Sequence, residues 1–411
     1  MRILYVTNFY PQHDLGGMEQ LCQEAAEALK QRGHGMAVLT SHYGVRNTSA
    51  TEPEVERSLY LEADLHHYRP LDFFLLRPWR ERHNRRALRH AIDALQPDLV
   101  FVWGLWNLSQ QLACWAERWM GPGRVAYAVA GYWFIEPNAH EAYWSRPANH
   151  LLPRLALAPA RALALRMLAR ERQQHPLALR HVSTVSAHVR DRMAQAGRLP
   201  HGARVIYIGI DPAPFVEAAA ARQPSDTLRL VYFGGLAEHK GVHTAIEALG
   251  LLRQQGRLAG MTLTIVGAGH PDYEARLRHL VEQQGLSAVV SFHGRVPRSE
   301  VPALLAGFDV FLFTSIWEEP IARTVMEAMA SGLGVIASPV GGQREMLEDG
   351  VNCLTYAPGD AVELAERIAA VAGSRSLVAR LAQAGRETVL QRFALRRMVD
   401  EYEAWLQEVS G

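Results

Sequence analysis

The chain has 411 residues, of which 48% are hydrophobic, and this apolar content is too high for a disordered protein. Its 43 Lys and Arg against 42 Asp and Glu leave a net charge of +1, so no overall positive field favours a nucleic-acid partner. Three cysteines lie far apart in the sequence and form neither a disulfide framework nor a zinc motif: Cys22, Cys114 and Cys353.

The charge is divided unevenly along the chain. Residues 1–208 hold 25 basic and 18 acidic side chains, whereas residues 209–411 hold 18 basic and 24 acidic ones. Halves of opposite net charge favour an organisation in two domains. No apolar stretch reaches the ~20 residues that span a bilayer, and the first apolar run is too short for a signal peptide, so we expect a cytoplasmic protein.

Short β-branched runs alternate with longer amphipathic segments, which is typical of parallel sheets covered by helices. In the first half the predicted strands are Ile3–Thr7, Met36–Thr40, Leu99–Trp103, Val125–Ala130 and His181–Val185. In the second half they are Leu228–Phe233, Leu263–Val266, Val289–Phe292, Val310–Thr314, Val335–Ala337 and Cys353–Tyr356. The predicted helices include Met18–Gln31 and Val242–Arg253. The sequence therefore predicts a doubly wound α/β fold that occurs twice.

Residues 209–226 mark the predicted boundary between the two domains. They carry three prolines and no sustained strand or helix pattern. We therefore expect a Rossmann-like N-terminal domain at residues 1–208 and a Rossmann-like C-terminal domain at residues 209–390. A final helical segment at residues 391–411 is expected to pack back on the N-terminal domain.

Two stretches of the N-terminal half are rich in arginine. Residues 68–89 hold seven Arg and two acidic residues, and residues 151–182 hold six Arg and one acidic residue. Basic amphipathic segments bind anionic membrane surfaces, but the solvated face of any arginine-rich helix has the same composition. Peripheral contact with the inner face of a membrane and a solvated helix face are both open interpretations.

Glycine turns follow several predicted strands, where backbone N–H groups can approach a phosphate. Gly16 and Gly17 follow the first strand, and Gly235 and Gly267 follow strands of the second half. Lys240 is one of only two lysines beside 41 arginines, which indicates a site that needs a compact ammonium group. Each turn alone could be an ordinary loop, but in a parallel sheet all of them gather at the carboxyl edge, where ligands bind.

The stretch Ser315–Gly332 combines a loop carboxylate with the start of a helix. Glu319 precedes the helix and Glu327 lies eight residues later, and Thr324 and Glu327 also fit a T-x-x-E capping box. In one interpretation Glu327 only closes the helix N-terminus. In the other, the N–H groups of Thr324 and Val325 face a diphosphate while both carboxylates accept hydrogen bonds from sugar hydroxyls. Together with the lysine loop, the second interpretation predicts a nucleotide-sugar site.

Six motifs occur in one order along residues 228–360: FGGLAEHKG, IVGAG, FHGRV, EPIARTVMEAMASG, VGGQRE and EDGVN. In this order and spacing they resemble glycosyltransferase family 4. The resemblance implies a GT-B fold, in which two Rossmann-like domains face a central cleft. It also implies a retaining enzyme of polysaccharide biosynthesis that moves a hexose from a UDP- or GDP-linked sugar to a glycan, lipid-linked or small-molecule acceptor. Neither a metal ion nor a cofactor is implied.

The resemblance assigns a role to individual residues of this sequence. Glu319 would bind hydroxyl groups of the donor sugar, and Lys240 would neutralise the diphosphate, so these two form the expected catalytic pair. Glu327 would bind the ribose, Gly17 would supply a backbone donor from the N-terminal domain, and Val296 would lie beside the base. The other expected donor contacts are Gly235, Gly267, Thr324 and Val325, with Gly16 and Glu345 in support.

The sequence departs from the family pattern at two places. Members usually carry an arginine at the position of Gly235, so half of the phosphate clamp is missing unless Arg323 replaces it. Many members also carry His or Asp after the fourth N-terminal strand, where this sequence has Ala130 and Gly131. These departures favour an alternative function, a catalytically degenerate nucleotide-sugar-binding protein with a regulatory or structural role. An epimerase or phosphorylase on the same fold is a weaker alternative.

Overall fold

The computed structural model describes residues 1–11, 16–44, 52–65, 67–146 and 151–411, with side chains throughout these ranges except at 151–156. The chain divides into two compact units. The first comprises Met1–Ile206 and Val399–Gly411, and the second comprises Tyr207–Met398. The first crossing between units therefore lies two residues before the expected 208/209 boundary, and the second unit extends to residue 398 rather than 390.

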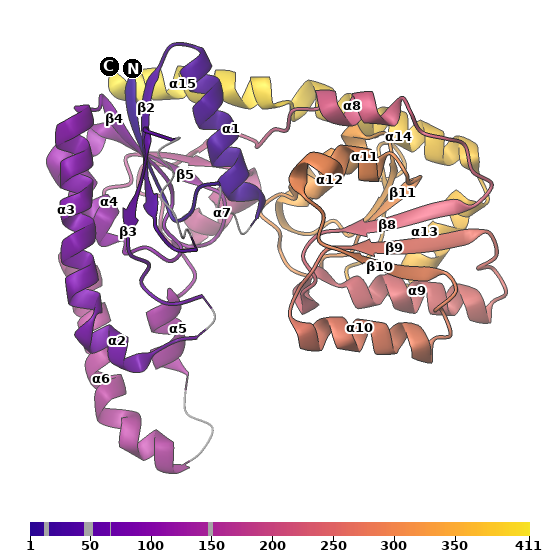
Figure 1. Ribbon diagram of the computed structural model, residues 1–411, viewed down its shortest axis with the longest axis horizontal. Helices are drawn as coiled ribbons and strands as arrows, with labels where there is room; N and C mark the ends of the chain where they lie inside the picture. Colours follow the sequence, from indigo (N-terminus) through magenta and orange to yellow (C-terminus); the bar gives the residue numbers. More distant parts are fainter. Residues whose placement is uncertain (12–15, 45–51, 66, 147–150) are drawn as a thin grey trace. The chain divides into compact units, whose positions relative to one another are not determined.

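The first unit is built on a parallel sheet in the order β3-β2-β1-β4-β5-β6-β7 (Figure 1). Its strands are β1 (Arg2–Thr7), β2 (Gly35–Ser41), β3 (Val55–Leu59), β4 (Leu99–Gly104), β5 (Val125–Val129), β6 (His181–Thr184) and β7 (Arg204–Val205). All five strands predicted for this half are present, and β3 and β7 were not predicted. Strand β1, in the interior of the sheet, is almost wholly buried, as expected where helices cover both faces of a parallel sheet.

The helices of the first unit connect these strands. They are α1 (Gly17–Gln31), α2 (Pro70–Leu75), α3 (Arg77–Leu95), α4 (Gln111–Met120), α5 (Ala139–Ser145), α6 (Leu151–Gln174) and α7 (Ala187–Gln195), with a short turn η1 (Pro122–Arg124). The last helix, α15 (Leu395–Ser410), places Tyr402 and Trp405 against Phe101 of β4, with ring centroids 5.6 and 6.1 Å apart. This aromatic contact joins the end of the chain to the first unit.

The second unit is built on a parallel sheet in the order β10-β9-β8-β11-β12-β13. Its strands are β8 (Leu228–Phe233), β9 (Met261–Val266), β10 (Val290–Gly294), β11 (Val310–Phe313), β12 (Gly334–Ala337) and β13 (Leu354–Thr355). All six strands predicted for this half are present. The chain leaves β8 for β9 on one side and returns to β11 on the other, so the loops after β8 and β11 diverge at a topological switch point, where ligands of such sheets bind.

Helices cover both faces of the second sheet. Figure 1 shows α9 and α10 along one face and α8, α11 and α12 along the other. The helices are α8 (Ala213–Ala219), α9 (Val242–Gln254), α10 (Pro271–Gln283), α11 (Val301–Leu305), α12 (Arg323–Ala330), α13 (Ala361–Ala372) and α14 (Arg375–Arg392). Three short 3-10 turns also occur: η2 (Glu238–Lys240), η3 (Arg298–Glu300) and η4 (Gly341–Glu345). The expectation that residues 209–226 lack a helix was wrong, because α8 begins directly after Pro212.

Candidate functional site

Lys240 and Glu319 meet at the switch point of the second sheet. Lys240 ends η2 after β8, and Glu319 lies in the loop between β11 and α12. The Lys240 Nζ and Glu319 Oε1 atoms are 2.5 Å apart, and Glu319 is only 6% exposed. The hydroxyl of Ser315 donates to the same carboxylate oxygen at 2.8 Å, and the hydroxyl of Thr314 donates to the carbonyl of Lys240 at 2.7 Å. The predicted catalytic pair is therefore brought together.

Glycines allow the loops around this pair to approach each other at main-chain distance. Gly241 has a φ of +63°, and a Cβ atom there would lie 2.1 Å from the carbonyl oxygen of Thr314. Gly341 has a φ of +55°, and a Cβ atom there would lie 2.1 Å from the carbonyl oxygen of Glu319. The N–H group of Gly342 donates to that same oxygen at 2.8 Å. The loops after β8, β11 and β12 thus interlock around Glu319.

The two glycines of the second unit that were predicted to contact the donor differ in their surroundings. Gly267 has a φ of +140°, and a Cβ atom there would lie 1.8 Å from the carbonyl oxygen of Gly234, so the loops after β8 and β9 pack closely. At Gly235, by contrast, a Cβ atom would meet no other atom within 4 Å. Its carbonyl accepts a hydrogen bond from the Tyr232 hydroxyl at 2.8 Å. Gly267 is required by packing, whereas Gly235 borders open space.

Glu327 is buried in α12 between two arginines. The N-cap residue of α12 is Ala322, which makes no side-chain cap, so Glu327 lies beyond the capping-box position and the capping-box interpretation is wrong. Its Oε1 atom accepts hydrogen bonds from Arg298 and, at 3.0 Å, from Arg323. Its Oε2 atom is buried and has no hydrogen-bond partner among the described residues. A buried carboxylate oxygen left without a donor is costly, and it is well suited to accept a ligand hydroxyl.

The start of α12 offers further donors. The first N–H groups of a helix, here including those of Thr324 and Val325, have no intrahelical acceptor and favour a negative charge. The N–H group of Ala322 is already taken by the side-chain oxygen of Gln343 at 2.7 Å. The two predicted N–H donors therefore lie on the helix that carries Glu327.

The remaining predicted residues lie on other elements. Gly16 is the N-cap of α1 in an extended conformation, and Gly17 is the first residue of that helix in the first unit. Val296 is half-buried in the loop after β10. Glu345 ends η4 and accepts a hydrogen bond from the Tyr207 hydroxyl at 2.8 Å.

The charges gathered on these loops favour an anionic ligand. In the ion pairs of the site, three cations, Lys240, Arg298 and Arg323, serve the two carboxylates of Glu319 and Glu327. Burial, with the neighbouring lysine adding to the effect, lowers the pKa of His239, which is therefore neutral at neutral pH.

Sequence reasoning did not find the partners that fix the carboxylates. Arg298 lies 29 residues before Glu327, and Ser315 and Gln343 contact the site through loop geometry that no spacing rule predicts. The sequence predicts a different role for Arg323, as a replacement for the arginine missing at Gly235. Arg323 and Glu327 lie four residues apart on one helix, and this spacing is the sequence signal that could have predicted their ion pair.

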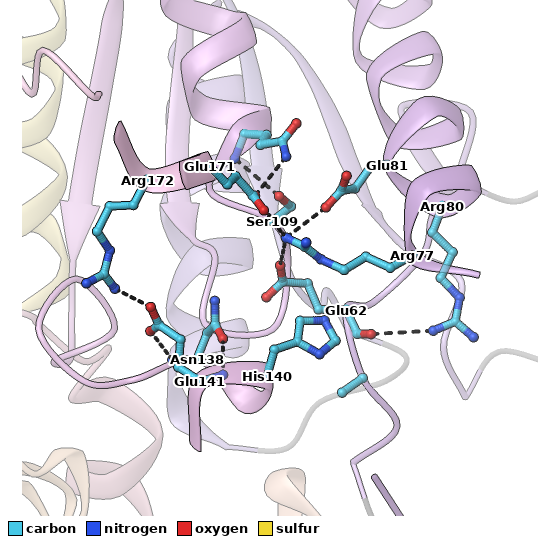
Figure 2. A network of polar contacts seen from close by, with 12 residues as sticks. Glu62, Arg77, Arg80, Glu81, Ser109, Asn138, His140, Glu141, Glu171 and Arg172 are labelled. Atoms are coloured by element: carbon cyan, nitrogen blue, oxygen red, sulfur yellow. Dashed lines mark hydrogen bonds and ion pairs between the residues drawn. The ribbon is translucent and has the colours of Figure 1, made fainter. Parts of the chain in front are cut away.

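A second polar cluster lies in the first unit, where three carboxylates surround one buried guanidinium group (Figure 2). The Nη2 atom of Arg77 lies 2.6 Å from Glu171, 2.9 Å from Glu81 and 3.6 Å from Glu62. Burial raises the pKa of both Glu62 and Glu81 to about 7, and Arg77 only partly offsets the effect. Because its members come from three separate segments, no sequence motif pointed to this cluster.

Further polar contacts, made by residues of α5 and α6 and by the loop after β3, surround this cluster. Burial lowers the pKa of His140 to about 3, and its Nδ1 atom lies 2.8 Å from the Tyr68 hydroxyl. Asn138 and Glu141 form a capping box at the start of α5, and Glu141 also pairs with Arg172 of α6 at 2.5 Å. These contacts hold α3, α5 and α6 against the loop that follows β3.

Two kinds of feature are absent from the described ranges. No group of three or more His, Cys, Asp or Glu residues there is arranged to hold a metal ion. Among the described residues, no helix has the length and apolar character needed to cross a membrane.

Two family models match the chain and together account for most of it. The model of Glycosyltransferase Family 4 matches residues 15–214, and that of Glycosyl transferases group 1 matches residues 217–388. The chain belongs to glycosyltransferase family 4. The predicted family is thereby confirmed.

Curated relatives match part of this family 4 chain. A lipopolysaccharide core biosynthesis glycosyltransferase of Rhizobium meliloti is 32% identical over 187 residues, which are 46% of this chain and 52% of the relative. The 2-deoxystreptamine glucosyltransferase of Streptomyces kanamyceticus is 28% identical over 261 residues, which are 59% of this chain and 66% of the relative. The chain spans about half the length of the curated relatives it matches.

Solved structures match the whole chain at low sequence identity. HepE of Anabaena, solved with UDP and glucose, has a TM-score of 0.71 at 21% identity, with 99% of each chain covered. A glycosyltransferase of Rickettsia africae has a TM-score of 0.72 at 19% identity, covering 99% of this chain and 98% of the other. These likenesses confirm the predicted GT-B fold.

Proposed function

We propose that this family 4 member is a retaining glycosyltransferase. It moves a hexose from a UDP- or GDP-linked sugar to a glycan, lipid-linked or small-molecule acceptor in polysaccharide biosynthesis. The observation that carries the proposal is the contact of 2.5 Å between Lys240 and Glu319 at the switch point of the second sheet. A structure of the same fold, HepE of Anabaena, is named as a complex with UDP-glucose, which supports a nucleotide-sugar donor.

In this proposal the diphosphate of the donor replaces Glu319 as the partner of Lys240. The ammonium group and the N–H groups of Thr324 and Val325 then stabilise the leaving diphosphate, which is where negative charge develops. Glu319, released from the lysine, accepts hydrogen bonds from hydroxyl groups of the sugar. The hydroxyl of Ser315, 2.8 Å from the carboxylate, keeps Glu319 oriented.

Glu327 binds the ribose of the donor in this proposal. Its Oε1 atom is held by Arg298 and Arg323, which leaves the buried Oε2 atom to accept a ribose hydroxyl. Because Arg323 is hydrogen-bonded to Glu327, it does not replace the diphosphate-binding arginine that is missing at Gly235. Lys240 therefore carries more of the diphosphate charge than it does in members with the arginine.

Other residues support the donor by their position. Gly267 and Gly235 bring backbone close to the ligand, and Val296 lies beside the base. Glu345, at the end of η4, supports the site. In this proposal the first unit binds the acceptor and the second unit binds the donor. The reaction takes place in the cytoplasm.

The proposed reaction is a front-face displacement at the anomeric carbon. The bond between this carbon and the diphosphate oxygen breaks while the acceptor hydroxyl attacks from the same side. The departing phosphate oxygen takes the hydroxyl proton, so the anomeric configuration is retained. The protein contributes chiefly by stabilising the leaving diphosphate.

A degenerate nucleotide-sugar-binding protein is the second candidate function. Ala130 and Gly131 follow β5 without an ionisable side chain, and Gly235 leaves open space where members carry arginine. These absences remove groups that would face the transferred sugar and its phosphate. The candidate predicts donor binding without turnover.

Release of nucleotide from UDP- and GDP-hexoses, with and without an acceptor mixture, separates the two candidates. We expect turnover by the wild-type chain and a loss of about 100-fold or more in Lys240→Met and Glu319→Gln. Lys30→Met is the matched control, because Lys30 is the only other lysine and pairs at the surface with Glu54. The anomeric configuration of the product, read by NMR, tests retention. Binding of a donor without any release would favour the degenerate protein.

A further inference from the structure

Exposed apolar side chains are concentrated on three helices of the first unit. Of the twelve large hydrophobic residues exposed in the described part of the chain, seven lie on α2, at the junction of α2 with α3, near the start of α3 or on α6. Leu71 and Leu75 are each 70% exposed, and Trp79 and Leu163 are each 52% exposed. Scattered apolar residues are normal on a soluble surface, but a concentration of this kind marks an interaction site.

On α2 and α3 the apolar residues form a stripe that continues into arginines. Leu71, Leu75 and Trp79 are spaced four residues apart, and Arg82 and Arg86 extend the same helical spacing. Helical backbone runs through the junction, where Leu76 is in the right-handed conformation and its carbonyl accepts the N–H group of Arg80. The stripe therefore changes from apolar to basic along one face.

Helix α6 repeats the combination. Leu163 and Met167 lie one turn apart and are exposed, and Arg166 and Arg170 lie beside them with the same spacing. The exposed arginines of the two stripes form no ion pair with any described residue. They are Arg82, Arg86, Arg166 and Arg170.

The two stripes lie on helices that pack against each other. Phe73 of α2 packs with Ala164 and Leu168 of α6 in one buried cluster, and Arg77 binds Glu171 of α6 at 2.6 Å. Figure 2 shows Glu81 and Glu171 directed at Arg77. Both of these acidic side chains are turned inward, and Asp72 and Asp93 pair with Arg80 and Arg89, which lie outside the two stripes.

We propose that this surface docks on an anionic lipid bilayer. The docking face consists of two stripes: Leu71, Leu75, Trp79, Arg82 and Arg86, and Leu163, Arg166, Met167 and Arg170. Apolar side chains of such a face enter the boundary between headgroups and acyl chains, while the arginines bind lipid phosphates. Such a bilayer would be a partner of the first unit and would present a lipid-linked acceptor to the enzyme. Only this link to the acceptor rests on the proposed function.

The charge arm of the test uses sedimentation of the full chain with vesicles. We expect binding to vesicles of phosphatidylcholine with phosphatidylglycerol, little binding to phosphatidylcholine alone, and weaker binding at high salt. The variant with Arg82→Gln, Arg86→Gln, Arg166→Gln and Arg170→Gln is expected to lose at least about tenfold in partition, since each arginine near the surface contributes about fivefold. Equal binding by this variant and the wild type would overturn the proposal.

A matched control removes as many exposed arginines from the second unit: Arg253→Gln, Arg257→Gln, Arg276→Gln and Arg278→Gln. This control is expected to bind vesicles like the wild type. If it loses as much binding as the first variant, the attraction is due to overall charge and the docking face is refuted.

The apolar arm distinguishes a bilayer from any other polyanion. Leu75→Ser with Trp79→Ser leaves the charge unchanged and is expected to lower partition about tenfold, because less apolar surface is buried. Unchanged binding of this variant would show that the arginines attract polyanions in general, and would overturn the lipid assignment. Thermal unfolding confirms that each variant is folded. Without vesicles, all variants are expected to bind UDP- or GDP-sugars as the wild type does. If the wild type itself binds no donor, the proposed function is refuted, but the lipid docking is not.

Discussion

Buried carboxylates are compensated in opposite ways in the two units. In the second unit two guanidinium groups, from Arg298 and Arg323, serve the single carboxylate of Glu327. In the first unit the single guanidinium group of Arg77 serves three carboxylates. The first arrangement leaves positive charge for an anionic ligand, whereas the second leaves negative charge that protonation relieves.

The first-unit cluster predicts a pH-dependent stability. Burial raises the pKa of Glu62 to about 7, so the folded chain holds a proton that the unfolded chain has lost. The stability due to this group is fully present below about pH 4.5 and is lost as the pH rises through about 7. Glu62→Gln cannot titrate, so its free energy of unfolding should gain on that of the wild type by roughly 2–3 kcal/mol as the pH rises from about 5 to about 8.

Denaturant unfolding of both proteins across this pH range measures the difference. His140, whose pKa burial lowers to about 3, has the opposite effect on stability, but it is present in both proteins and cancels. The matched control is Glu136→Gln, at an exposed position of the same unit. Parallel stability curves for Glu62→Gln and the wild type would contradict the assignment.

Gly235 leaves room for a charged side chain beside the proposed diphosphate. A Cβ atom there would meet no atom within 4 Å, so a side chain can leave the backbone at this position without a clash. Gly235→Arg is expected to tighten binding of the nucleotide-sugar donor about tenfold, because a guanidinium group binds the diphosphate. Calorimetry measures the dissociation constant, and Gly235→Leu is the uncharged control. An affinity for the donor that stays the same in Gly235→Arg would contradict the placement of the diphosphate.

At the scale of elements, the glycine that follows η2 positions Lys240. Gly241→Ala is expected to destabilise the second unit by more than about 2 kcal/mol, since it combines a left-handed backbone with a clash against the carbonyl of Thr314. Gly256→Ala is the control, because Gly256 has a φ of +70° but open surroundings, and we expect a cost of about 1 kcal/mol. Chemical denaturation compares the two. Equal losses would show that the close approach at Gly241 is unimportant.

The predicted strands were found because a buried parallel strand is a short continuous apolar run. The strands missed were those without that signal. β3 (VERSL) has charged residues at half-buried positions, and β7 has only two residues. Helix α8 was not predicted because prolines such as Pro212 and Pro214 are typical of a linker, although proline is also well tolerated in the first turn of a helix.

Part of the candidate site could be predicted because the topology of a parallel sheet places the loops after neighbouring strands side by side. Lys240 and Glu319 are 79 residues apart, but each follows a strand next to the switch point, so a parallel sheet brings their loops together. The contacts of Arg298 with Glu327 and of Arg77 with three carboxylates depend instead on how particular side chains cross between elements. No periodicity in the sequence encodes those contacts.

At the scale of the whole molecule, two parallel sheets divide the chain into units whose limits depart from the sequence boundaries at both ends. The second unit begins at Tyr207, and the last residues, Val399–Gly411, belong to the first unit. The aromatic contacts of Tyr402 and Trp405 with Phe101 account for this return. The sequence predicted a final helical segment that packs back on the N-terminal domain, but it did not show at which residue the chain passes from the second unit to the first.

Calorimetric titration shows whether the second unit binds a nucleotide sugar through Lys240, Glu319 and Glu327. The full chain is titrated with UDP- and GDP-sugars, beside Glu327→Gln and the exposed control Glu300→Gln. We predict that the wild type and the control bind one nucleotide class equally, and that Glu327→Gln binds it at least about tenfold more weakly. Binding of no donor by the wild type, or equal binding by Glu327→Gln, would contradict the account.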